Sequence, residues 1–249
     1  MSKKALREKI WGTLTANGVA CFPGAFGRIP NFKGAQTAAR HLTAVPMWGK
    51  ARTLKCNPDS PQRYVRYAAL KAGKVIYMAV PRLRSQEPFI ELDPTGLDSV
   101  ALWQASSIRG AFTLGKPVAL QAMSTIDLIV AGSVAVSRDG SRLGKGGGYS
   151  DLEYALAREV DLIVEETPIV TTIHPLQIVP NGDIEMRDHD ISLGWVATPE
   201  KVFQTDSPHL QPTGILWDEL DKRLEKIPVL KNMVKHQSGH KRPYRRTGK

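Results

Sequence analysis

The sequence predicts an α/β fold: three layers, with a mostly parallel sheet between two layers of helices. Short apolar runs alternate with helix-like segments along most of the chain, and several of the runs are apolar throughout. Strands with continuous apolar cores are typical of parallel sheets buried on both faces, and the intervening helices supply the crossovers. At 249 residues the chain is long enough to bury a sizeable core.

The N-terminal part predicts two helices separated by a loop. The segment from Lys3 to Thr15 has apolar residues at four-residue spacing, which indicates an amphipathic helix: Leu6, Ile10 and Leu14. A Gly/Pro-rich loop at 22–34 follows, and then a helix from Gln36 to Thr43.

The alternating pattern occupies the middle of the chain. The apolar runs predict strands at 53–56, 75–80, 117–123, 126–136, 160–164 and 168–173. Helix-like segments lie between several of them, at 62–73 and 151–159. This order is typical of crossover units in a parallel sheet.

The charge distribution divides the chain in two. The net charge is +10, and residues 231–249 hold seven Lys or Arg residues and no acid, which leaves +3 for residues 1–230. We therefore expect a folded domain at 1–230 and a basic, disordered tail at 231–249. Tyr244 stands among the arginines of this tail, so contact with nucleic acid through 231–249 is a further hypothesis, against the alternative of a solubilising tail.

The sequence also bears on the cellular compartment of the protein. No apolar run is long enough to cross a bilayer, and the N-terminus lacks the apolar core of a secretory signal. Cys21 and Cys56 match no metal-binding spacing. We expect a reduced, cytoplasmic protein without a membrane partner.

The stretch GSRLGKGGGYSD, residues 140–151, has five glycines in its first nine positions. It stands between an apolar strand and a predicted helix, where glycine amides and a helix N-terminus together form an anion site. Arg142 and Lys145 add positive charge, so the pattern predicts a phosphate site.

Other interpretations of this loop remain. No G-x-x-x-x-G-K-[ST] motif occurs, which excludes a P-loop. A dinucleotide-binding loop has some support, because Glu165 stands roughly 20 residues further on, but the glycine spacing and the distance from Val136 do not fit it. A flexible turn with solvated cations is the structural alternative.

The stretch resembles the G-x-R-L-G-x-G-x-G-Y-Y-D signature of the 5-formyltetrahydrofolate cyclo-ligases. Further matches follow in the family's order: KKALR (3–7), PRLR (81–84) and DHDISLGWVAT (188–198). The sequence is most similar to the branch of methenyltetrahydrofolate synthase domain-containing proteins, through RIPNFKGA (28–35), SDLEYALA (150–157), EETPIV (165–170), GILW (214–217) and IPVL (227–230). The resemblance implies the NagB/RpiA/CoA-transferase-like fold.

The resemblance also implies the reaction, its cofactors and the residues of its site. ATP, with Mg²⁺, phosphorylates the formyl oxygen of 5-formyltetrahydrofolate, and ring closure then yields 5,10-methenyltetrahydrofolate. Asp151 and Asp190 match the carboxylates associated with Mg²⁺, and Arg142, Lys145 and Tyr149 are the implied catalytic residues. The implied ATP contacts are Lys3, Lys4, Arg7, Arg142, Leu143, Gly144, Lys145, Gly146, Gly147, Gly148 and Tyr149.

The chain departs from the family pattern at two positions. Asn57 stands where a glutamate that helps hold the folate is expected, and Ser150 replaces the second tyrosine of Tyr-Tyr-Asp. An amide offers no carboxylate to the guanidine-like edge of a pterin. The nucleotide half of the site is therefore retained and the folate half altered. A diverged ATP-dependent enzyme for another small substrate, in thiamine-related metabolism for example, is the alternative function.

Overall fold

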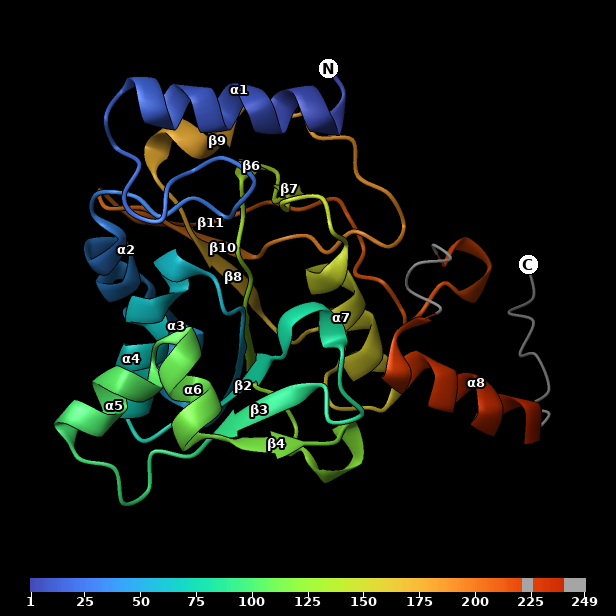
Figure 1. The fold of residues 1–249 in the computed structure, drawn as a ribbon. Helices are drawn as coiled ribbons and strands as arrows, with labels where there is room; N and C mark the ends of the chain where they lie inside the picture. Colours follow the sequence, from blue (N-terminus) through green and yellow to red (C-terminus); the bar gives the residue numbers. More distant parts are fainter. Residues whose placement is uncertain (221–225, 240–249) are drawn as a thin grey trace.

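The computed structural model describes residues 1–220 and 226–239 (Figure 1). An eight-stranded sheet has the order β11-β10-β8-β5-β1-β2-β3-β4, and a three-stranded sheet has the order β7-β6-β9. The strands are β1 (Thr53–Cys56), β2 (Val75–Ala79), β3 (Phe89–Leu92), β4 (Lys116–Val118), β5 (Leu128–Val130), β6 (Ala135–Ser137), β7 (Arg142–Leu143), β8 (Ile169–Thr172), β9 (Ile178–Val179), β10 (Trp195–Ala197) and β11 (Val202–Gln204). The α-helices are α1 (Lys3–Ala16), α2 (Ala35–Leu42), α3 (Pro46–Lys50), α4 (Arg63–Lys71), α5 (Ser99–Ala105), α6 (Ile108–Leu114), α7 (Tyr149–Glu159) and α8 (Pro228–Gly239).

The large sheet is mostly parallel at its centre. Strands β10, β8, β5, β1 and β2 run parallel to one another, while β11 pairs antiparallel with β10 and β3 pairs antiparallel with β2. On β1, Leu54 is in register with Leu128 of β5 and Ile76 of β2. The predicted α/β class is confirmed.

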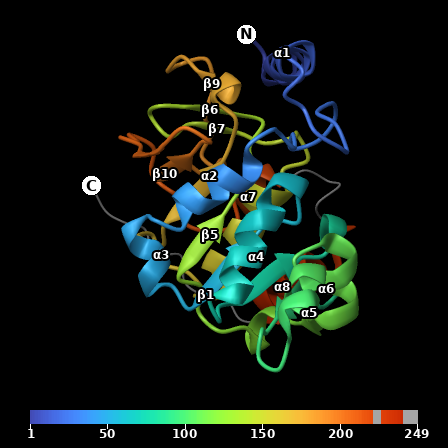
Figure 2. The same ribbon diagram turned by 90° about the vertical axis from the view of Figure 1, so that its left-hand side faces the viewer.

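Helices cover both faces of this sheet (Figure 2). Leu54 and Val130 face a core shared with α2, α4, α5 and α6. Tyr77 and Ile129 face the opposite core, which includes Leu156 of α7 together with residues of α8. Because strands expose alternate residues to opposite faces, a continuous apolar run is buried completely in such a three-layer arrangement.

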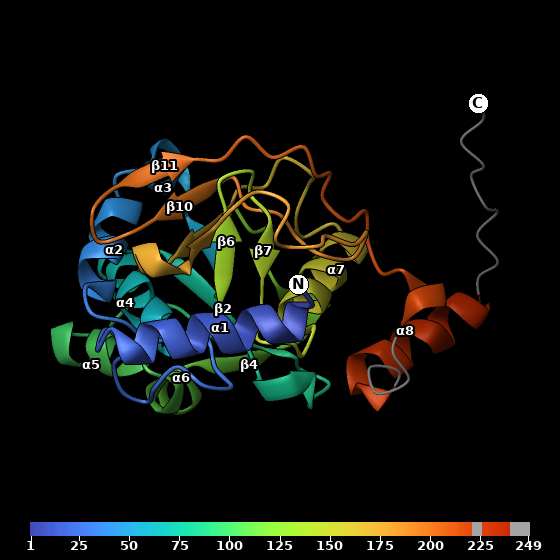
Figure 3. The same cartoon turned by 90° about the horizontal axis from the view of Figure 1, so that it is seen from above.

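Helix α1 packs on the small sheet rather than on the large one. Its residues Leu6, Ile10, Trp11 and Leu14 are buried with Ala135, Leu143 and Val179. Seen from above, α1 crosses the end of the molecule where β6 and β7 lie (Figure 3). The predicted N-terminal helix is confirmed. The apolar residues that recur every four positions form the face of α1 that packs on the small sheet.

Two of the predicted strands are wrong in detail. The run at 126–136 forms β5 and β6 in different sheets. The residues between them are not strand, and the backbone groups of Gly132 and Ser133 bond to the side chains of Asn57 and Gln177. The run at 160–164 is not a strand but the turn after α7, where Asp161 has φ 57° and Leu162 accepts from the Ile126 amide. Leu162 and Ile163 are buried in the core, which explains their apolar character without a strand.

A third strand is shorter than predicted. Only the first two residues of the run at 117–123 are strand: they belong to β4, which pairs antiparallel with β3, and a 3-10 turn follows at Leu120–Ala122. Strands β3, β7, β9, β10 and β11 were not predicted from the sequence, and neither were helices α3, α5, α6 and α8.

The division of the chain at residue 230 stays a prediction. Helix α8 crosses this position and ends at Gly239. Residues 240–249, which include Tyr244 and the arginines around it, lie outside the described residues.

Both cysteines are free in the described structure. Burial raises the pKa of the Cys56 thiol to about 11, so this thiol stays protonated near neutral pH. Among residues 1–220 and 226–239, no helix is both long and apolar enough to span a membrane.

We expect Gly110→Ala to lower the free energy of unfolding by about 1–3 kcal/mol, as overpacked positions do. Gly110 packs so closely against the end of α5 that an added Cβ lies 1.9 Å from the Gln104 carbonyl oxygen. Gly12→Ala is the matched control, because its Cβ meets nothing within 4 Å and the residue lies inside α1. It should stabilise the protein by about 0.5–1 kcal/mol. Urea unfolding of both variants measures the difference, and equal effects would contradict the close contact of α5 and α6.

Candidate functional site

The site lies where strands β1 and β5 end. The segment after β1 brings Asn57 and Asp59 to this edge, and Gly132 follows β5. The loop 144–148 between β7 and α7, here called the glycine loop, reaches the same edge: Lys145 contacts Asp59, and an added Cβ on Gly132 lies 2.8 Å from Asp59 Oδ2. Ligands bind at this edge in open α/β sheets.

The glycines are required by the backbone of the loop. Gly146 has φ 100° and Gly148 has φ 69°, conformations that favour glycine. Gly148 is also the N-cap of α7, and no side chain caps this helix. Residues 145–148 are exposed. The amide groups at the start of α7 are therefore available to an anion.

Two cations of α1 contact the site: Arg7 bonds to the glycine loop, and Lys3 pairs with Asp190. Arg7 Nε donates to the Gly144 carbonyl at 2.7 Å, and Lys3 Nζ lies 2.5 Å from Asp190 Oδ2. Burial lowers the pKa of Arg7, and the nearby Asp190 and Asp151 act in the opposite direction. Within the described part of the chain, Arg7 has no carboxylate within 4.0 Å. Lys4 is exposed and likewise makes no ion pair there.

Arg142 is held inside the structure. Its side chain is 3% exposed, with Nη1 3.0 Å from Asp151 Oδ1 and Nη2 donating to the Gly132 carbonyl at 3.0 Å. Leu143, the next residue of β7, is buried in the core beneath α1. Both were predicted to contact ATP. The contacts of Arg142 join β7 to α7 and to Gly132 after β5, while Leu143 packs against α1.

Asp151 and Asp190 lie close together. Asp151 Oδ1 accepts from the Ile191 amide at 3.2 Å, and Asp190 Oδ2 accepts from the Arg187 amide at 2.9 Å. The described residues give Asp151 Oδ2 no hydrogen bond, and Asp190 Oδ1 has only His189 Nε2 at 3.9 Å. No group of three or more potential ligand side chains occurs in the described ranges. Two carboxylates with open oxygens fit a Mg²⁺ ion that takes its other ligands from phosphate and water.

Lys145 and Tyr149 stand at either end of the exposed part of the loop. Lys145 Nζ lies 2.9 Å from Asp59 Oδ1, and its side chain is 46% exposed. Tyr149 packs against the core around α7 with its ring beside Gly147. Lys145 is thus the cation of the loop that faces solvent.

A buried polar network underlies the loop, and it was not predicted from the sequence. Lys55 of β1 and Glu153 of α7 form an ion pair in which both side chains are 5% exposed or less. Asn57 donates to Glu153 Oε2 at 3.2 Å, while its Oδ1 accepts from the Gly132 amide at 3.3 Å and from Ser150 Oγ at 3.2 Å. The one feature of the sequence that could have indicated a buried ion pair was Lys55, which stands between two apolar residues of a predicted strand.

The network explains the two departures from the family pattern. Asn57 is buried and uses both ends of its amide, and Ser150 bonds to it. Neither side chain projects freely into the site. The carboxylate that borders the glycine loop is Asp59, two residues after Asn57.

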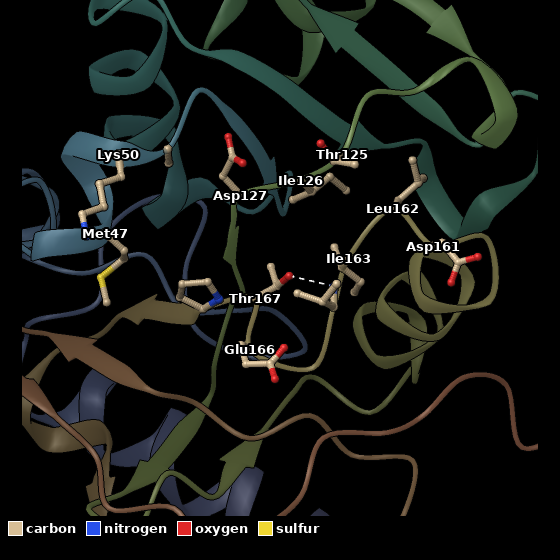
Figure 4. Close-up of a pocket in the computed structure, with 13 residues that line it drawn as sticks. Met47, Lys50, Thr125, Ile126, Asp127, Asp161, Leu162, Ile163, Glu166 and Thr167 are labelled. Atoms are coloured by element: carbon tan, nitrogen blue, oxygen red, sulfur yellow. Dashed lines mark hydrogen bonds between the residues drawn. The ribbon is translucent and has the colours of Figure 1, made fainter.

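A separate hollow of about 420 Å³ lies at the opposite end of the parallel strands (Figure 4). It is bordered by residues just before β5 and β8, among them Asp127 and Thr167. Asp127 accepts from the Arg52 and Thr53 amides, and Thr167 accepts from the Val164 amide. These polar groups satisfy the backbone, and none of the predicted site residues lines this hollow.

We expect Lys55→Met to lower the free energy of unfolding by about 3–5 kcal/mol, because it leaves the Glu153 carboxylate buried without a counter-charge. The double variant Lys55→Met with Glu153→Leu should lose less free energy of unfolding than Lys55→Met alone, since no unpaired charge remains. Lys71→Met, at an exposed position of α4, is the control and should stay within about 0.5 kcal/mol. Urea unfolding tests all three, and a double variant no more stable than the single one would refute the pairing.

Comparisons with known proteins identify the family of this chain. The chain matches the 5-formyltetrahydrofolate cyclo-ligase family over residues 1–199. The methenyltetrahydrofolate synthase domain-containing protein of Mus musculus is 39% identical over 235 residues, which cover 94% of this chain and 63% of that protein. Its Homo sapiens counterpart is 34% identical over 235 residues, which cover 94% of this chain and 61% of that protein. The chain thus spans less than two thirds of these relatives.

The solved structure of Aquifex aeolicus 5,10-methenyltetrahydrofolate synthetase is similar with a TM-score of 0.52, over 84% of this chain and 95% of that chain. At 16% identity this likeness concerns the fold, and it agrees with the mostly parallel α/β sheet found here. The family match extends over most of the chain and contains the glycine loop, both carboxylates and the cations of α1. The chain therefore belongs to the 5-formyltetrahydrofolate cyclo-ligase family.

Proposed function

We propose that the chain is an ATP- and Mg²⁺-dependent cyclo-ligase that converts 5-formyltetrahydrofolate to 5,10-methenyltetrahydrofolate. One observation carries the proposal: the exposed glycine loop, the uncapped start of α7 and Arg7 meet beside Asp151 and Asp190. This combination supplies amides, a guanidinium and two carboxylates at one place. Phosphoryl transfer depends mainly on positioning and charge neutralisation, for which these groups are suited.

The phosphates of ATP would lie along the glycine loop. Loop amides and the first turn of α7 would donate to phosphate oxygens, and Arg7 would add the charge of a guanidinium that forms no ion pair with a carboxylate of the described residues. Lys3 and Lys145 are partly exposed, at 22% and 46%, and would exchange their aspartate partners for phosphate. Lys4, Gly144 and Tyr149 remain proposed contacts on the strength of the family motif.

Asp151 and Asp190 would hold Mg²⁺ through their open oxygens. The ion, when bound, would neutralise phosphate charge. Arg142 would act differently from the role that the motif suggests. Because it is buried against Asp151 and Gly132, it would orient the Asp151 carboxylate and fix the end of the glycine loop.

Asp59 would supply the carboxylate for the second substrate. It borders the glycine loop through Lys145, and it follows Asn57 by two residues. If ATP attracts Lys145, Asp59 is left to pair with a guanidine-like edge such as that of a pterin. Asp59 would thereby replace the carboxylate that position 57 lacks.

A diverged substrate is the second candidate function. The specific observation is that Asn57 and Ser150 belong to a buried network rather than to an open folate site. An ATP-dependent activation of another small molecule, in thiamine-related metabolism for example, would use the same nucleotide half. Nucleic-acid contact through 231–249 and a cytoplasmic location stay predictions from the sequence.

We expect Arg7→Gln to weaken Mg·ATP binding by about tenfold or more, the worth of one charge-assisted hydrogen bond. Gly146→Val should weaken it as well, because its φ of 100° disfavours a side chain and its Cβ lies 3.2 Å from the Arg7 guanidinium carbon. Lys9→Gln, an exposed change on the same helix, is the control. Calorimetric titration measures all four proteins. Equal affinities would remove the glycine loop as the nucleotide site.

We expect purified protein with Mg·ATP and 5-formyltetrahydrofolate to produce the absorbance of methenyltetrahydrofolate. Asp59→Asn should raise KM for the folate more than it changes ATP affinity, since Asp59 is assigned to the second substrate. Asp206→Asn is the matched control at an exposed carboxylate. A flat absorbance trace from protein that binds ATP normally would reject the cyclo-ligase reaction and favour the diverged substrate.

A further inference from the structure

A second hollow of about 420 Å³ lies on α5 and α6, outside the residues assigned above. Arg63 and Arg109 line it together with Trp103, Ser107, Thr113 and Leu114, and no acidic residue takes part. It therefore offers two guanidinium groups, two hydroxyls and two apolar side chains. The combination suits an anionic ligand that also carries an apolar ring.

Arg63 is held in place before any ligand arrives. Its guanidinium carbon lies 3.9 Å from the centroid of the Trp103 ring. Its Nη2 donates to the Trp103 carbonyl at 3.3 Å, and its Nε donates to Ser106 Oγ at 3.4 Å. A guanidinium fixed on an aromatic face loses little conformational entropy when it binds an anion.

Arg109 is the second cation and is exposed. In the part of the chain that the structure describes, no carboxylate lies within 4.0 Å of it or of Arg63. Three cations of the glycine-loop site differ in this respect, since Lys3, Lys145 and Arg142 each pair with an aspartate, whereas Arg7 and Lys4 pair with none among the described residues. The hollow on α5 and α6 thus keeps its positive charge uncompensated.

This hollow is connected to the candidate active site through one buried arginine. Arg66 Nη1 donates to the carbonyls of Asn57 at 2.5 Å and Asp59 at 3.2 Å, and its Nε donates to the Ser106 carbonyl at 2.8 Å. Ser106 also accepts from Arg63. Figure 2 shows α5 and α6 beside α4, in the same layer of helices. The hollow therefore lies next to the Asp59 side of the site.

We propose that this hollow binds the carboxylate tail of the substrate. The inference rests on the proposed function, because folates carry a p-aminobenzoyl group followed by one or more glutamates. Arg63 and Arg109 would pair with the glutamate carboxylates, and Trp103 and Leu114 would contact the aminobenzoyl ring. Asp59 would meet the other end of the same molecule, so the two sites share one elongated ligand.

The test uses p-aminobenzoyl-triglutamate, which lacks the pterin and needs no catalysis to be measured. Calorimetry with the full chain should detect binding that weakens as salt increases. Arg109→Gln should reduce the affinity about ten- to hundredfold, as expected for a lost charge-assisted hydrogen bond. Arg40→Gln, at an exposed position of α2, is the matched control and should change nothing. Because the described structure gives the Arg109 guanidinium no partner, this variant should fold normally.

Two results would overturn the inference. One is that p-aminobenzoyl-triglutamate does not bind to the unaltered protein. The other is that the unaltered protein and the Arg109→Gln variant bind it with equal affinity. Binding lost equally in Arg40→Gln would show general attraction of a polyanion and would also count against the hollow. Arg63→Gln should lower the affinity for p-aminobenzoyl-triglutamate more than Arg109→Gln does. Thermal unfolding of this variant checks that α5 stays folded.

The absorbance assay separates this inference from the proposed function. Suppose that the protein turns over 5-formyltetrahydrofolate, that KM is the same for substrates with one and three glutamates, and that Arg109→Gln leaves KM unchanged. This result would retain the cyclo-ligase reaction and reject the tail site. A flat assay combined with Arg109-dependent binding of p-aminobenzoyl-triglutamate would reject the reaction and support the hollow as a carboxylate site.

Discussion

The buried ion pair between Lys55 and Glu153 constrains the rest of the site. Each side chain is removed from water, and each charge is tolerated only because the other lies against it. Lys55 belongs to the central strand β1 and Glu153 to the second turn of α7, so the pair fixes where α7 lies on the sheet. The start of α7 then falls at the ends of β1 and β5. The glycine loop follows from that position, because it joins directly to this helix.

Burial separates the cations of the site into two groups. Lys55 and Arg142 are nearly inaccessible, at 2% and 3%, and bond to groups of the protein on several sides. Lys3 and Lys145 are more exposed and each has one aspartate partner. A charge that already satisfies buried partners is costly to redirect, whereas an exposed pair contributes little and exchanges readily. The first group therefore builds the site and the second is available to a ligand.

This distinction also shows why part of the site was inaccessible to sequence reasoning. The glycine run was recognisable because backbone positions with positive φ favour glycine, as at Gly146 and Gly148. Arg142 was not recognised as buried, because β7 has only two residues and the pairing that encloses it leaves no periodic pattern. The break between β5 and β6 was not recognised, because both strands beside it are fully buried and the run 126–136 is mostly apolar. Lys55 and Glu153 are 98 positions apart, so only the fold brings them together.

The same network gives a physical reason for the departure from the family pattern at residue 57. Asn57 donates to Glu153 and accepts from Gly132, which requires a side chain that is both donor and acceptor. A glutamate there would place a second carboxylate beside Glu153 in a buried environment and would remove the donor. Lys55, Asn57 and Glu153 are thus coupled, and a change at position 57 alone is unfavourable while the other two remain. Under the proposed function, the carboxylate for the second substrate would come from a neighbouring position, and Asp59, which pairs with the partly exposed Lys145, is the one that borders the glycine loop.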